Sequence, residues 1–357
     1  MEVVLRLKNR SVERVPLVDG AVGSGAFFGR PDIIAAVLPR HATAIGKDAF
    51  YGCSSLASVT IREGVTTIGW GAFQGCSSLA SVTIPERVTS IGPLAFIGCW
   101  SLTEITIPVG VTRIEPYTFQ DCVSLVSVRI PEGVTTIGSC AFFSCRSLVS
   151  VRIPEGVTTI EDFTFLHCLS LVSVTFPAGL RRIFKGAFYG CSSLASVTIP
   201  AGVSTIDDAV FEACTGLRSV VVAGASIDAD KLRELFKKCT QLALVVGPAE
   251  TIRDMPQKTP AKLRNSSLPR FLPLAVESEE EWEPESAVGM KLSPAAVGLV
   301  ERWNPQTHSL SSPNQVEWVK FALLTLTRRM GLPHTVAVVV LQSLHRSELG
   351  DGRAIEL

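Results

Sequence analysis

Ten cysteines and five histidines are the side chains of this 357-residue chain best suited to metal binding, disulfide formation or nucleophilic attack. Eight of the cysteines stand 23 residues apart, at positions 53, 76, 99, 122, 145, 168, 191 and 214. A structural zinc site needs ligands about two to four residues apart, usually in two pairs. One cysteine per repeat instead predicts a small apolar side chain buried at the same place in every repeat, with a free thiol. We therefore assign no metal ligand and no cofactor.

Catalytic pairs are hard to find in this sequence. His167 precedes Cys168, but adjacent side chains point apart, and the other repeats carry unrelated residues before their cysteine. The chain has no glycine-rich phosphate loop followed by lysine, no H-E-x-x-H and no G-x-S-x-G. The sequence therefore predicts a protein that is not an enzyme.

The elements that hold the cysteines form an internal repeat. Phenylalanine recurs every 23 residues from position 27 to 211, and leucine does so from position 56 to 217. In each unit Leu-x-x-Val-x-Ile alternates like a half-buried strand, and a proline ends this strand in most units. Val-Thr-x-Ile forms a second extended piece, and Ala-Phe-x-x-Cys-x-x-Leu has the spacing of a helical or 3₁₀ turn. Phe236 and Cys239 continue both columns after a step of 25. We expect about ten stacked coils with one shared core.

The motif Ile-Pro-Glu-Gly-Val-Thr-Thr-Ile-Gly-x-x-Ala-Phe-x-x-Cys-x-Ser-Leu-x-Ser-Val, around residues 130–151, resembles the BspA-type leucine-rich repeat. The resemblance covers residues 16–247. It implies a repeat solenoid: a right-handed curved coil with a parallel β-sheet on one face, short helical or 3₁₀ turns outside it, and no enzymatic activity. Some members of this family are surface adhesins, and many others are intracellular.

One face of the predicted sheet should be exposed, because polar residues alternate with inward Val and Ile. Solenoids commonly bind partners on such a surface, although Ser and Thr also serve simply as soluble strand formers. Arg129 and Arg152 add a basic spot that Arg113 and Arg182 would extend. The units are nearly identical along this face, which favours weak repeated contacts or a spacing role. The candidate partner-binding residues are Ser58, Thr60, Ser81, Thr83, Glu104, Thr106, Arg113, Ser127, Arg129, Ser150, Arg152, Ser173, Thr175, Arg182, Ser196 and Thr198.

The segments outside the repeats differ in composition. Residues 1–15 form an N-terminal segment, residues 248–294 read as a linker rich in proline and glutamate, and residues 295–357 recover apolar content. Helical spacing in the last segment predicts a small helical module. Within it, Leu332-Pro333 followed by Val340-Leu341-x-x-Leu344 faintly resembles an F-box helix pair. That resemblance implies docking to a ubiquitin-ligase adaptor, with the repeats as substrate receptor.

Charge and hydropathy narrow the choice of partners. The 33 basic and 33 acidic residues cancel, so no general attraction to nucleic acid or membrane lipid is expected. No apolar run approaches the ~20 residues of a membrane-spanning helix, and the N-terminus lacks the apolar stretch of a secretion signal. We therefore expect a cytoplasmic, non-catalytic scaffold that binds a protein partner. The alternatives are a ubiquitin-ligase substrate receptor and a surface adhesin.

Overall fold

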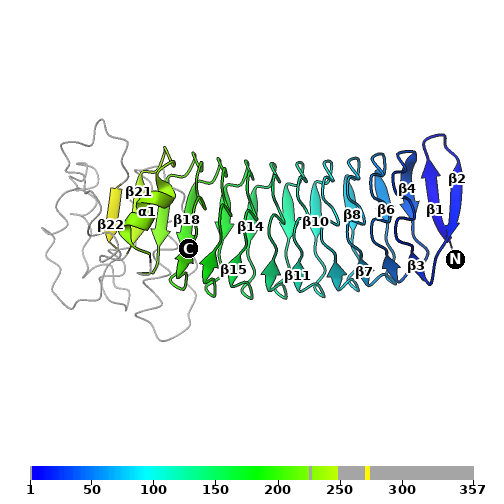
Figure 1. Cartoon of the computed structure of the whole chain (residues 1–357), viewed down its shortest axis with the longest axis horizontal. Coiled ribbons are helices and arrows are strands. Elements are labelled where there is room, and N and C mark those ends of the chain that lie inside the picture. Colours follow the sequence, from blue (N-terminus) through cyan, green and yellow to red (C-terminus); the bar gives the residue numbers. More distant parts are fainter. Residues whose placement is uncertain (1, 225–226, 248–269, 274–357) are drawn as a thin grey trace, which may run out of the picture. The chain divides into compact units, whose positions relative to one another are not determined.

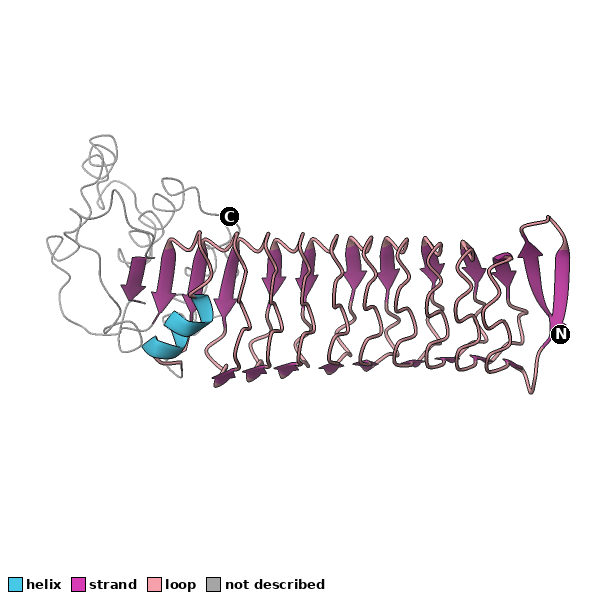
Figure 2. Cartoon of the chain, turned by 45° about the horizontal axis from the view of Figure 1, so that its top comes forward, coloured by secondary structure: helices cyan, strands magenta, loops and turns pink. Residues whose placement is uncertain are grey.

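Stacked coils form most of the described chain, as Figure 1 shows. In each coil the chain passes through a strand of a first ladder, turns, passes through a shorter strand of a second ladder, and returns through an outer turn segment (Figure 2). Both ladders are parallel, so the predicted solenoid with a parallel sheet face is confirmed. The computed structural model describes residues 2–224, 227–247 and 270–273.

The chain divides into two compact units, and the solenoid lies within the first of them, residues 1–255 together with 272–274. The predicted linker at 248–294 falls outside the described residues except for β22 (Arg270–Pro273). The predicted helical module at 295–357, with its F-box-like segment, also lies outside them.

Short strands of the two ladders alternate along the chain. Those of the first ladder are β4 (Ile33–Val37), β6 (Ser58–Thr60), β8 (Ser81–Thr83), β10 (Glu104–Thr106), β12 (Ser127–Arg129), β14 (Ser150–Arg152), β16 (Ser173–Thr175), β18 (Ser196–Ile199), β20 (Ser219–Val222) and β21 (Leu244–Gly247). Those of the second are β3 (Ala21–Val22), β5 (Ala44–Ile45), β7 (Thr67–Ile68), β9 (Ser90–Ile91), β11 (Arg113–Ile114), β13 (Thr136–Ile137), β15 (Thr159–Ile160), β17 (Arg182–Ile183) and β19 (Thr205–Ile206).

The pairing register follows the repeat length. Ser58 pairs with Ser81, 23 residues on, so equivalent positions of successive coils lie above one another. The last step is longer, because Ser219 pairs with Leu244, and this places the two-residue insertion seen in the sequence. A register equal to the repeat keeps every inward residue on the core side, where a slip of one residue would turn it outward.

Phenylalanine rings form a stacked column through the core. Every column member from Phe27 to Phe211 is at most 2% exposed. Successive ring centroids are 4.9 to 5.7 Å apart, and the column ends with Phe236 on Phe211 at 5.4 Å. Rings at this separation gain contact energy beyond simple burial. A single coil could not bury its ring without the coils on either side, so stability depends on stacking.

The outer segment that carries these rings consists of separate turns and contains no continuous helix. Leu79 N–H donates to the carbonyl of Cys76, and Cys76 N–H to that of Phe73, which are three-residue turns. Two positions per coil have positive φ, and this interrupts helical continuation. The first column is Gly25, Asp48, Gly71, Leu94, Tyr117, Cys140, Phe163, Gly186 and Ala209, and the second is Gly29, Gly52, Gly75, Gly98, Asp121, Ser144, His167, Gly190 and Ala213.

Each end of the solenoid has an element outside the repeat pattern. At the N-terminal end β1 (Glu2–Leu7) pairs antiparallel with β4 and with β2 (Val12–Pro16). Val3 and Leu5 of this hairpin are buried, whereas its outer strand carries charged residues and ends in proline, features that discourage pairing with another sheet. Near the other end lies α1 (Ala229–Phe236). Terminal units of this kind keep the last core residues from water.

Candidate functional site

The exposed face of the first ladder is the candidate site. In β6 the side chains of Ser58 and Thr60 are exposed while Val59 between them is 8% exposed. The same alternation recurs in β8, β10 and β14, and in β12 and β16 the central valine is half-buried. The alternation follows from strand geometry, because successive side chains point to opposite faces. The result is a polar face of repeated hydroxyl groups over a dry core.

Most of the residues predicted for this face occupy it. Ser196 and Thr198 of β18 are only half-buried, and Ser219 in the next coil is buried. The exposed part of the face therefore extends from β6 to β16. The exposed members are Ser58, Thr60, Ser81, Thr83, Glu104, Thr106, Ser127, Arg129, Ser150, Arg152, Ser173 and Thr175.

Arg113 and Arg182 do not join this face, which corrects the prediction that they extend the basic spot. They belong to β11 and β17 of the second ladder. In each coil a proline-containing turn separates the two ladders and carries the chain to the other side. Arg113 pairs with Glu115 at 3.4 Å, and Arg182 pairs with Asp207 at 3.2 Å, so both are engaged on the second ladder.

The two arginines that remain on the face differ in their partners. They stand on β12 and β14, which are neighbours in the stack. Arg152 Nη2 lies 3.2 Å from a carboxylate oxygen of Glu132, but both side chains are well exposed, and such pairs contribute little. Among the described residues no ion pair involves Arg129. The pair can therefore offer guanidinium donors to an anionic group.

The cysteine column lies in the core, as the spacing predicts, and its thiols are hydrogen-bonded. Each Sγ donates to the carbonyl of a phenylalanine of the preceding coil, as Cys53 does to Phe27 at 3.1 Å. Burial raises the pKa of Cys53 to about 11 and that of Cys239 to about 12. A buried thiol that donates to a carbonyl stays protonated and is a poor nucleophile.

The one neighbouring Cys–His pair is not assembled. The Cys168 thiol donates to the carbonyl of Phe142 at 3.2 Å in the core. The His167 ring instead packs edge-on against Phe143 and Tyr189 on adjacent coils. The two side chains thus serve different contacts, and no nucleophile is activated there.

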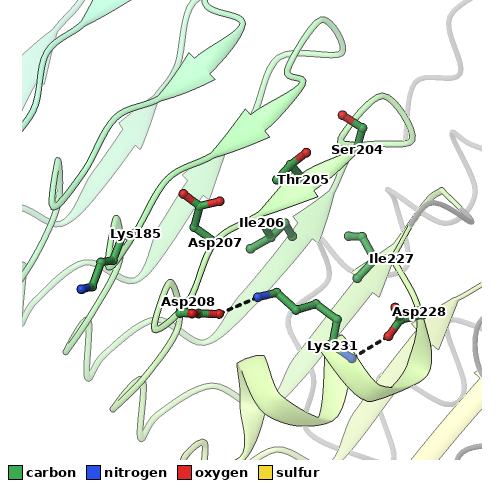
Figure 3. Close-up of a pocket in the computed structure, with 9 residues that line it drawn as sticks. All are labelled: Lys185, Ser204, Thr205, Ile206, Asp207, Asp208, Ile227, Asp228 and Lys231. Carbon is green, nitrogen blue, oxygen red and sulfur yellow. Dashed lines mark hydrogen bonds and ion pairs between the residues drawn. The ribbon is translucent and has the colours of Figure 1, made fainter.

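A hollow of about 500 Å³ lies beside α1 and the last coils (Figure 3). Its charged groups are largely paired with one another. Lys231 Nζ lies 2.8 Å from Asp208 Oδ1, and this contact lowers the pKa of the Asp208 carboxyl. The backbone N–H of Lys231 donates to Asp228 Oδ1 at 2.7 Å, which caps the helix. Its lining contains no histidine or cysteine, so the usual bases and nucleophiles are missing from it.

Comparison with known proteins identifies the repeat. The family described as the BspA type leucine rich repeat region matches residues 20–132 and 112–243, with six copies. The chain belongs to the BspA-type leucine-rich-repeat family. Among solved structures, the BspA-type solenoid is similar to a leucine-rich repeat protein of T. pallidum, at 33% identity over 54% of this chain and 86% of the other, with a TM-score of 0.43.

Two further solved structures resemble the BspA-type chain. One is a leucine-rich repeat protein from Eubacterium ventriosum, 25% identical, covering 60% of this chain and 66% of the other, with a TM-score of 0.41. The second is the pneumococcal vaccine antigen PcpA, 18% identical, covering 75% and 86%, with a TM-score of 0.37. The search of curated proteins found no match.

The described part of this BspA-type protein offers no assembled centre for metal chemistry. Within it, no three His, Cys, Asp or Glu side chains are grouped so as to hold a metal ion. None of the helices in the described ranges is long and apolar enough to cross a membrane. The first-ladder face is therefore the surface on which a function can be argued.

One feature of the BspA-type face was missed in the sequence. Val126, Val149 and Val172 directly precede β12, β14 and β16 and are exposed, although valine usually packs inward in such repeats. A position-by-position comparison of the units would have found them, because Ala57 and Ala80 stand at the same position in earlier coils.

Proposed function

We propose that this chain is a non-catalytic protein-interaction scaffold that binds a partner on the first-ladder face. The supporting observation is the continuous exposed face from β6 to β16, opposite a core that uses only the alternate residues. Core contacts, ladder hydrogen bonds and ring stacking hold each coil without these outward side chains. The face can therefore bind a partner without loss of stability.

The chemistry of the face suits contact with polypeptide. Its hydroxyl groups can both donate and accept hydrogen bonds, so they match backbone or side-chain groups of a partner. The groups recur once per coil, at about 4.8 Å, and many weak contacts can then act together. The arginines on β12 and β14 add charge-assisted bonds to this surface.

Site-specific photo-crosslinking in the native cell tests the proposal on the full-length protein. A benzophenone amino acid replaces Ser81 on the face in one variant and Thr67 on the second ladder in a matched control; both positions are exposed. Discrete protein adducts from position 81 and not from position 67 are the expected result. Adducts from neither position, or equal adducts from both, would contradict binding on this face.

A further inference from the structure

Three consecutive coils differ from the others on the surface while their core stays the same. The residue before the first-ladder strand is Ala57, Ala80 or Ala195 in other coils, but Val126, Val149 and Val172 in these three. We call these three the valine column. They are 47%, 43% and 46% exposed, so the larger side chains add apolar surface to water and fill no space in the core. Side chains with no part in stability are free to serve binding.

The valine column is continuous from coil to coil. The N–H of Val149 donates to the carbonyl of Val126 at 3.2 Å, and the N–H of Val172 to that of Val149 at 2.8 Å. The three side chains thus stand on adjacent coils, roughly one strand spacing of ~4.8 Å apart. They form an apolar strip along the rim of the face.

Basic residues accompany the valines in the first two of these coils. Arg129 and Arg152 replace the threonine that this strand position carries in β8 and β16. Each lies three residues after its valine, or about 10 Å along the strand. The pairing partners on the flanking strands are Thr106 and Thr175, so the arginine pair is bounded on both sides by hydroxyl groups.

Further departures lie on the same rim. Trp100 and Leu169 are 58% and 39% exposed, and Arg146 is exposed between them. The equivalent residue is serine in the earlier coils that contain Ser54 and Ser77. Aromatic residues and arginine are enriched at protein interfaces, and Trp and Arg often dominate their binding energy.

Charge complementarity indicates what the partner carries. Arg129, Arg146 and Arg152 outnumber the acidic groups near them, which are Glu104 on β10 and Glu132 in its exposed pair with Arg152. From these observations we infer that the valine column and the arginine pair, together the central patch, bind an acidic protein segment that also carries apolar side chains. This inference rests on the proposed function and locates its binding energy in the coils of β12, β14 and β16.

Selection from a displayed library of random dodecapeptides tests the inference on the full-length protein. The matched variant carries V126A, V149A, V172A, R129T and R152T, which are the residues of the same positions in other coils. It should fold, because those coils accept Ala and Thr there, and a thermal melt checks this. We expect peptides that combine Asp or Glu with Leu, Ile, Phe or Trp, and at least a tenfold loss of their affinity for the variant.

The outcomes separate the inference from the proposed function. Peptides that bind the parent and the variant equally would overturn the central patch and leave the face as a binding surface. Failure to select any peptide, together with absent crosslinks at position 81, would remove both. A fluorescent single-stranded oligonucleotide that binds only when the arginines are present, with no peptide selected, would assign the patch to nucleic acid and refute the protein partner.

Discussion

Raising the pH from 7 to 9 should destabilise the solenoid through its buried thiols. Burial raises the pKa of each of the nine buried cysteines above its ordinary value. In the unfolded chain a thiol titrates near ~8.5. Because the folded pKa is the higher one, this contribution to stability is fully present below about pH 8.5. It is lost as the pH rises from there towards the folded pKa, since only the unfolded chain releases the protons.

The expected magnitude is large because the column is long. At pH 9 each thiol favours the unfolded chain by about 0.8 kcal/mol relative to pH 7. Nine such groups together give about 7 kcal/mol, which is comparable with the whole stability of a typical domain, ~5–15 kcal/mol. Lysine and arginine stay charged and tyrosine stays protonated over this range, so few other groups contribute.

Urea unfolding followed by circular dichroism at the two pH values, with a phosphine reductant, measures the effect. The control carries C122S and C145S. Its serine hydroxyls can still donate to the carbonyls of Phe96 and Phe119, but they do not titrate. Its loss of unfolding free energy between the two pH values should be smaller by about 1.6 kcal/mol. A urea midpoint that does not change with pH, or a loss equal in parent and control, would refute the reasoning.

Three other perturbations follow from the packing. Phe142→Ala, between two stacked rings, should lower the free energy of unfolding by about 3–5 kcal/mol in urea titrations, and a loss below about 1 kcal/mol would deny the column its role. Gly52→Ala has room, since the new Cβ meets only the Gly29 Cα at 3.6 Å, but its φ of 68° should cost about 1 kcal/mol, seen as a lower melting temperature; an unchanged melt would contradict this. Asp228→Ala removes the cap at the Lys231 N–H and should weaken α1 locally by about 1 kcal/mol, measured as faster amide exchange in α1 alone; unaltered exchange would count against the cap.

The core and the ladders were the parts that a single sequence could predict. The cysteine and phenylalanine columns are buried as their spacing predicts, and the step of 25 before Phe236 appears as the shifted pairing of Ser219 with Leu244. These predictions succeed because each position recurs in many coils, so periodicity averages out local ambiguity. The outward residues of β6 to β16 follow from the same alternation.

Other features could not be derived from residue types. Leu94 and Tyr117 have positive φ, although the sequence carries glycine at this position in other coils, because the register of the stacked coils imposes the conformation. The N-terminal segment gave no sign that β1 would pair antiparallel with β4, since an end cap depends on which edge is left open.

By itself, the sequence determined the repeat length, the inward columns and the exposed hydroxyl face, because a 23-residue period leaves only one way to bury the same residues in every coil. Only the tertiary structure decided which charges share a surface. It separated Arg113 and Arg182 from Arg129 and Arg152, and it placed the exposed valines beside the latter pair. The physical reason is that neighbours on a solenoid surface come from different coils, and the turns between the ladders set the side to which each residue belongs.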